Sequence, residues 1–183
     1  MDRHLRPALP GLVLLAFVLS GASARAGERL GTDLFAGYSF ARVNELGRHG
    51  GNAWIGFDLV GPFAGFVDAS AHWGQGTGLD RSDVTLMAGP GVRFGKRGGT
   101  VFFVRALAGV LRERASIGVL DVDIGESSNR LGAMGGGGVE LRIAKRWAAC
   151  LTGDYLWNNA KDGGKKSGFR ASAGIVRRFG VVE

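Results

Sequence analysis

Residues 168–180 read GFRASAGIVRRFG and decide the fold. Side chains of a β-strand alternate between two faces, so this stretch separates an apolar face from a charged one. The apolar face carries Phe169, Ala171, Ala173, Ile175 and Phe179. The other face carries Arg170, Ser172, Gly174, Val176 and Arg178. The pattern recurs along the chain, with the charge on the smaller, glycine-rich face. An apolar outside and a polar inside reverse the order of a water-soluble protein and are typical of a membrane β-barrel.

The N-terminal segment predicts export. Basic residues within the first six positions precede a short apolar run at residues 12–19, and Ala24 and Ala26 supply the small residues that signal peptidase reads. The apolar run is too short to cross a bilayer, which takes about 20 helical residues. We therefore expect residues 1–26 to be a cleaved signal peptide and residues 27–183 to form one outer-membrane β-barrel domain.

Charge and cysteine content narrow the function. Cys150 is the only cysteine, so no intrachain disulfide can form. The formal net charge is +7, but the basic residues are spread along the chain instead of massed in one patch. That distribution argues against a nucleic-acid surface and favours phosphate-rich lipopolysaccharide as the counterpart.

Alternation and turn signals predict eight strands. They cover residues 32–42, 52–60, 64–74, 83–95, 100–112, 131–143, 147–157 and 168–180. The gaps alternate in length, and the long ones are residues 43–51, 75–82, 113–130 and 158–167. The short ones are residues 61–63, 96–99 and 144–146. Short periplasmic turns and long extracellular loops are typical of outer-membrane barrels. The sequence thus predicts an all-β, eight-stranded antiparallel up-and-down transmembrane β-barrel with both ends in the periplasm.

The spacing of two tryptophans agrees with a membrane-spanning strand. Trp147 and Trp157 share a face, and the segment between them spans ~33 Å, or ~25 Å along the membrane normal once the strand tilts. We expect aromatic girdles built from Trp73, Phe94, Trp147, Trp157 and Phe179. Trp54 is the exception, since its parity points inward.

Parity also places many charged residues in the lumen, where eight strands leave room only for side chains. The predicted ion-pair residues are Asp58, Asp68, Arg93, Arg105, Glu140, Arg142, Asp154 and Arg170. Arg178, Ser70 and His72 share this inward face. Arg105 and Glu140 lie at similar depth on neighbouring strands, so we expect them to form one ion pair, with Asp68 joining across the lumen. Unpaired buried charges cost several kcal/mol each, which makes a structural role the favoured interpretation.

Catalytic and ligand motifs are weak by comparison. Ser70 and His72 share a face, but no acidic residue has a spacing that singles it out as a third partner. The glycine run at residues 135–138 lies within a strand, whereas a nucleotide loop needs a strand-to-helix junction. The three histidines have no metal-ligand spacing. We expect no catalytic residue, no cofactor and no metal, and hence no enzyme.

Three segments resemble a known family. Residues 35–40 (FAGYSF), 88–94 (AGPGVRF) and 169–176 (FRASAGIV) are similar to the small outer-membrane β-barrel family related to the OmpA transmembrane domain and OmpX. The resemblance implies a C-terminal aromatic residue that the barrel-assembly machinery reads, a part that Phe179 fills. Residues 180–183 beyond it, and the outward Arg177, depart from the family pattern.

Membership of such a family does not fix function. The leading interpretation is a non-enzymatic protein of the Gram-negative outer membrane, in contact with membrane lipid and lipopolysaccharide. Its longest loop, residues 113–130 with Asp121, Asp123 and Glu126, is the candidate element for an extracellular ligand, since loops on rigid scaffolds tend to carry function. A solvated connector is the other interpretation of that loop. A narrow porin-like pore, a lipid A-modifying acyl hydrolase and a soluble lipocalin-type barrel remain as alternatives.

Overall fold

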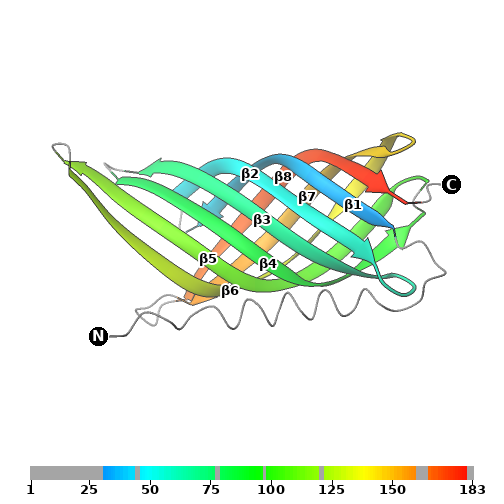
Figure 1. The fold of residues 1–183 in the computed structure, drawn as a ribbon, viewed down its shortest axis with the longest axis horizontal. Helices are drawn as coiled ribbons and strands as arrows, with labels where there is room; N and C mark the ends of the chain where they lie inside the picture. Colours follow the sequence, from blue (N-terminus) through cyan, green and yellow to red (C-terminus); the bar gives the residue numbers. More distant parts are fainter. Residues whose placement is uncertain are drawn as a thin grey trace, which may run out of the picture.

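The chain forms one closed β-barrel. The computed structural model describes residues 31–43, 46–76, 79–96, 98–119, 122–159 and 165–180. Its strands are β1 (Thr32–Val43), β2 (Leu46–Asp58), β3 (Phe63–Gly76), β4 (Leu79–Gly95), β5 (Val101–Val119), β6 (Val122–Ala144), β7 (Trp147–Asn159) and β8 (Lys165–Phe179). Each strand pairs antiparallel with the next, and β8 pairs with β1 (Figure 1). The predicted eight-stranded up-and-down barrel is therefore confirmed.

The two ends of the barrel differ in the connections that they hold. The turn end holds the start of β1, the end of β8 and the short connections after β2, β4 and β6 (Figure 1). The opposite end, here called the hairpin end, holds the other four connections. Gly95 closes β4 at the turn end with φ 108°, a conformation that side chains with a Cβ rarely adopt. Within the described residues there is no helix of the length and apolarity needed to cross a membrane. The predicted signal peptide, residues 1–26, lies outside the described residues.

The prediction of long loops at the hairpin end is wrong for residues 43–51, 75–82 and 113–130, and the ends of the fourth, residues 158–159 and 165–167, are strand as well. β2 begins at Leu46 and β4 at Leu79, and the β5–β6 ladder continues to the pair Val119–Val122. Most of the residues assigned to loops thus extend the strands as antiparallel hairpins (Figure 1). The apolar alternation that locates a strand arises from burial against lipid. A hairpin standing in water needs no such alternation, so its ladder leaves no signal of that kind in the sequence.

The outer wall is apolar. Large exposed side chains occur on all eight strands, among them Leu34, Ile55, Trp73, Val84, Leu86, Phe102, Val104, Leu131, Leu151 and Ile175. The structure places all five predicted girdle residues on this wall near strand ends. Trp73 and Trp157 lie toward the hairpin end, whereas Phe94, Trp147 and Phe179 lie toward the turn end.

The interior is packed with side chains. Trp54 points inward, is 1% exposed, and lies with its ring 5.3 Å from that of Phe35 and 5.6 Å from those of Phe66 and Phe103. These four rings are called the aromatic cluster below. Its size requires small neighbours: a Cβ on Gly138 would lie 2.7 Å from Cζ of Phe103. The glycine run at residues 135–138 lies inside β6, and its two inward members, Gly136 and Gly138, make room for Asp154 and Phe103.

Candidate functional site: the polar lumen

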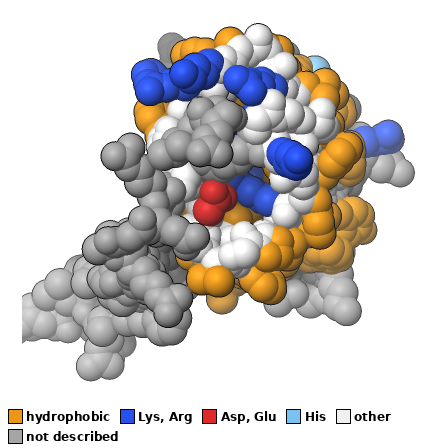
Figure 2. Space-filling model, turned by 90° about the vertical axis from the view of Figure 1, so that its right-hand side faces the viewer, with side chains coloured by type: hydrophobic (Ala, Val, Ile, Leu, Met, Phe, Trp, Pro, Cys, Tyr) orange, Lys and Arg blue, Asp and Glu red, His pale blue; other side chains and the backbone are white. Residues whose placement is uncertain are grey.

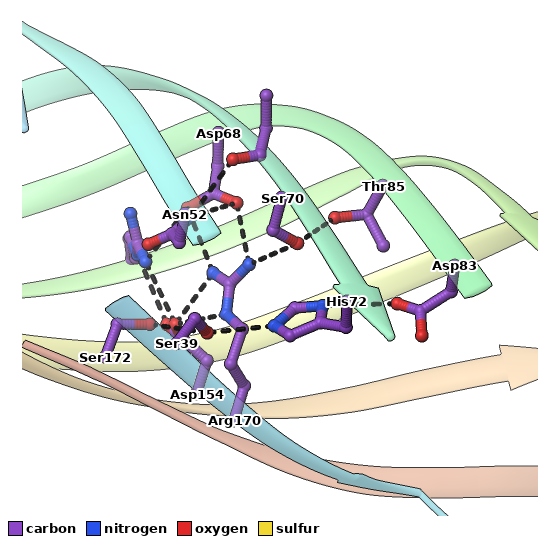
Figure 3. A network of polar contacts seen from close by, with 12 residues as sticks. Ser39, Asn52, Asp68, Ser70, His72, Asp83, Thr85, Asp154, Arg170 and Ser172 are labelled. Atoms are coloured by element: carbon purple, nitrogen blue, oxygen red, sulfur yellow. Dashed lines mark hydrogen bonds and ion pairs between the residues drawn. The ribbon is translucent and has the colours of Figure 1, made fainter. Parts of the chain in front are cut away.

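The centre of the lumen holds two arginines and two aspartates from four strands. Arg170 of β8 binds Asp68 of β3 at 2.8 and 2.9 Å and Asp154 of β7 at 2.9 Å (Figure 3). Arg105 of β5 binds the same two carboxylates, at 3.0 Å to Asp154 and 3.2 Å to Asp68. All four side chains are buried, with exposures of 0–3%. Two positive and two negative charges therefore cancel within this central cluster. Each buried charge thus has an opposite charge as its partner, as burial requires.

The rest of the lumen supports this central cluster. Asn52 donates hydrogen bonds from Nδ2 to both carboxylate oxygens of Asp68, each at 3.1 Å. The guanidinium carbon of Arg105 lies 5.8 Å from the ring centroid of Trp54 and 5.7 Å from that of Phe103. Cations at such distances over aromatic faces are attracted by the ring quadrupole. The central cluster of arginines and aspartates thus lies directly against the aromatic cluster.

The predicted pair between Arg105 and Glu140 is wrong. Strand register places Arg105 opposite Gly136, and Gly136 opposite Asp154, so Arg105 lies level with Asp154. Glu140 lies opposite Val101, four residues closer to the turn end, and binds Arg178 at 2.8 Å. Counting residues from the strand ends assumes that strands are level, whereas the strands of a closed barrel are staggered. The suggestion that Asp68 joins from across the lumen agrees with the contacts observed.

A second group of charges lines the opening at the turn end. Arg93 bridges Asp33 at 2.5 Å and Asp58 at 2.9 Å. Together with Glu140 these residues line a cavity of about 320 Å³. Figure 2 views this end and shows acidic side chains within the opening and basic ones around the rim.

Arg142 is a further correction. The sequence predicts an ion pair in the lumen for this residue, but its side chain is exposed and donates from Nη1 to the carbonyl oxygen of Gly98 at 2.7 Å. The pairing of β6 with β7 shifts register between Arg142 and Ala144, where the barrel wall ends. A residue at that rim meets solvent, whatever its parity.

A buried chain of Asp, His and Ser lies toward the hairpin end. His72 Nδ1 lies 3.2 Å from Asp83 Oδ2, and His72 Nε2 lies 2.9 Å from Ser39 Oγ (Figure 3). The order of contacts is that of a hydrolytic triad. The sequence suggested Ser70 for this role and no acid. Ser70 instead contacts Thr85 Oγ1 at 2.6 Å. Parity alone does not reveal this arrangement, because its three residues lie on three different strands.

The surroundings of these three side chains leave little space for a substrate. Ser39 is 0% exposed and also accepts a hydrogen bond from Ser172 Oγ at 3.0 Å. The neighbouring cavity, lined by His72 and Asp83, measures about 10 Å³, which is room for about one water. Asp83 further binds Arg48 at 2.6 Å. The hydrogen-bonded series Ser39–His72–Asp83 is thus one part of the polar packing of the lumen.

No cluster of metal ligands is present in the described part of the chain, where no three His, Cys, Asp or Glu side chains converge on one point. Cys150 faces the lumen and is buried. Asp121, Asp123 and Glu126, named above for the longest loop, have side chains outside the described residues.

A closed eight-stranded barrel with an apolar wall and an ion-paired interior has the fold of the small outer-membrane β-barrels. Solved structures with this fold include Neisserial surface protein A, with a TM-score of 0.59, 15% identity, and coverage of 82% of this chain and 97% of that chain. Ail from Yersinia pestis has a TM-score of 0.61 at 14% identity, covering 83% of this chain and 100% of its own. OprG from Pseudomonas aeruginosa has a TM-score of 0.54 at 9% identity, covering 82% and 96%.

Sequence comparison adds nothing to this likeness. No family model matches the chain, and no curated protein sequence matches it. The expected resemblance to small outer-membrane barrels is confirmed for the fold.

Proposed function

We propose that this protein is a non-enzymatic outer-membrane β-barrel that displays the β5–β6 hairpin at the cell surface for interaction with a partner. The turn end faces the periplasm and the hairpin end faces outward. Residues 1–26 direct export and are then removed, and the barrel-assembly machinery inserts the mature chain into outer-membrane lipid beneath lipopolysaccharide. The aromatic Phe179 at the end of β8 supports that route.

The length of the β5–β6 hairpin carries this proposal. Its ladder runs from the pair Val101–Glu140 to the pair Val119–Val122. Pairing of β4 with β5 stops at Ser116, and pairing of β6 with β7 begins only at Gly132. Within the described residues, positions 122–131 of β6 therefore have no neighbouring strand on the β7 side, an open edge of ~34 Å at ~3.4 Å per residue. Open strand edges pair readily with another chain.

The sequence of the hairpin tip favours a protein partner. Residues 117–124 read IGVLDVDI, which alternates apolar and small or acidic residues and contains no Lys or Arg. Ail has been solved in complex with the heparin analogue sucrose octasulfate. A polyanion of that kind would be repelled by Asp121 and Asp123, whereas an extended peptide segment can add to a strand edge by backbone hydrogen bonds alone.

The packed lumen supports a role outside the barrel. The aromatic cluster, with exposures of 0–2%, and the neutral central cluster fill the space in which a pore would run. The buried Ser39–His72–Asp83 chain faces a cavity too small for a lipid.

Cysteine labelling tests the display of the hairpin. In a Cys150→Ser background, Ser127→Cys should react with a membrane-impermeant maleimide on intact cells. Gly98→Cys, in the connection between β4 and β5, should react only after the outer membrane is permeabilised. The reverse pattern would invert the orientation, and equal labelling of both would contradict insertion in the membrane.

A further inference from the structure

Charged side chains are sorted between the inside and the outside of the barrel. All seven acidic residues whose side chains the structure describes are buried or half-buried. By contrast, seven of the Lys and Arg side chains that the structure describes are exposed. Five of them lie at the turn end, and we call them the basic rim: Lys96, Arg142, Lys145, Arg146 and Arg177. The other two, Arg42 and Arg112, lie toward the hairpin end.

Arg177 occupies the apolar wall itself. It pairs with Trp147 of β7 on one side and with Leu34 of β1 on the other. Its guanidinium carbon lies 5.5 Å from the ring centroid of Trp147 and 5.1 Å from that of Phe179. Both rings are more than two-fifths exposed. Among the described residues no carboxylate lies within ion-pair distance of Arg177, so its charge faces outward between two girdle aromatics.

The neighbouring turn adds charge at the same place. The carbonyl oxygen of Arg146 accepts a hydrogen bond from the backbone N–H of Arg178 at 2.9 Å. This bond ties the β6–β7 turn to the end of β8, next to Arg177. Lys145 and Arg146 are both exposed in that turn. Three cations therefore gather at the turn end of β7 and β8, at the edge of the apolar wall.

We propose that this part of the basic rim binds the phosphate of an anionic phospholipid in the periplasmic leaflet. The proposal rests on the membrane location and orientation given under the proposed function. Aromatic girdles lie at headgroup depth. An Arg at this depth presents a planar fork of N–H donors that matches phosphate oxygens, and it is weakly hydrated enough to rest on aromatic faces. The lipid phosphate lies against Arg177 and Arg146, with its acyl chains along Trp147 and Phe179.

The expected size of the effect follows from surface electrostatics. A Lys or Arg near a membrane surface attracts anionic lipid with about 1 kcal/mol, which corresponds to about a fivefold enrichment. Removal of Arg177 should therefore abolish most of a severalfold local preference for anionic over zwitterionic lipid.

Fluorescence quenching by brominated lipids tests the site, with Trp147 as the reporter. The full-length mature chain carrying Trp73→Phe and Trp157→Phe is refolded into phosphatidylcholine vesicles, which leaves Trp147 and the lumenal Trp54. Dibrominated phosphatidylglycerol or dibrominated phosphatidylcholine is then added in increasing proportion. Half-maximal quenching should need about fivefold less brominated phosphatidylglycerol. Arg177→Gln should bring the two curves together, whereas Arg42→Gln at the other end should leave them apart.

The outcomes separate this inference from the proposed function. Quenching by neither lipid would contradict insertion in a bilayer and so overturn both. Equal quenching by both lipids in the unaltered rim would overturn the phospholipid site alone. If Arg177→Gln does not refold, as judged by heat-modifiable gel mobility, the pair Lys145→Gln and Arg146→Gln decides. A preference for phosphatidylglycerol that is as large in that double variant as in the unaltered rim would also overturn the site.

Discussion

At the scale of single residues, the buried charges at the centre of this barrel, and those that link β6 to β8, are arranged in neutral groups. Arg170 and Arg105 share Asp68 and Asp154, and Arg178 binds Glu140. Pairs of this kind add little net stability relative to well-packed apolar residues, but loss of one partner leaves a buried charge without compensation. They therefore specify which strands face one another across the lumen.

A double-mutant cycle should separate the pair that forms from the pair that the sequence suggested. Glu140→Gln and Arg178→Met should each lower the free energy of unfolding by about 3–5 kcal/mol, because each strands a buried partner. The double variant should cost less than the sum by about 1 kcal/mol or more. The measurement is urea unfolding in lipid vesicles followed by tryptophan fluorescence.

The control cycle combines Glu140→Gln with Arg105→Met. These two residues bind different partners, so their effects should add within about 0.5 kcal/mol. Strict additivity in the Glu140–Arg178 cycle would show that those two side chains do not interact.

Ser39 offers a second test at this scale. Its place in the Ser39–His72–Asp83 chain resembles that of a nucleophile, but it is buried and hydrogen-bonded to Ser172. We expect mass spectra of lipid A to be the same for cells that express the protein, the Ser39→Ala variant or an empty vector. Deacylated lipid A that appears with the protein and disappears with Ser39→Ala would establish an acyl hydrolase.

At the scale of strands, the sequence predicts those parts of the fold that lipid and lumen impose. Alternation in residues 168–180 located β8 and the faces of Arg170 and Phe179, because one face must be apolar and the other must fill the lumen. The stagger between strands is not encoded by alternation, and the Arg105–Glu140 pair was wrong for that reason. The length of the β5–β6 hairpin was missed because backbone pairing in water imposes no pattern on either face.

Shortening the β5–β6 hairpin should separate display from folding. Residues 117–124 are replaced by Asn-Gly, which closes a two-residue turn after the pair Ser116–Gly125. The described residues among those excised, 117–119 and 122–124, pair only with one another, so the free energy of unfolding should change by less than about 0.5 kcal/mol. Cells expressing this variant should lose adherence to a surface coated with serum proteins, whereas cells with the unaltered chain adhere.

The surface levels of the shortened variant and of the full-length chain are measured, and then matched, by labelling Gly47→Cys in a Cys150→Ser background. Position 47 lies in the β1–β2 hairpin. Equal adherence of the two strains would rule out the β5–β6 hairpin as the interaction element. A large drop in unfolding free energy would show that the hairpin supports the barrel.

At the scale of the whole molecule, the barrel is inverted in polarity and closed in its interior. The acidic side chains that the structure describes are gathered inside with arginine partners, and the outer wall is apolar with cations at its edges. Between the cavity at the turn end and the central cluster stands the aromatic cluster, whose neighbouring rings lie 5.3–5.6 Å apart. A continuous path for ions would have to cross both clusters.

Single-channel recording in planar bilayers should therefore show no unitary current steps for the unaltered protein. Phe66→Ala removes the ring that packs against both Trp54 and Phe103, and should produce resolvable steps. Because loss of a buried Phe costs about 3–5 kcal/mol, folding of the variant is checked by heat-modifiable gel mobility. Phe63→Ala on the same strand is the matched control, since Phe63 is 57% exposed. Current steps from the unaltered protein or from the Phe63→Ala variant alone would contradict a lumen closed by the aromatic cluster and would restore the narrow pore as its function.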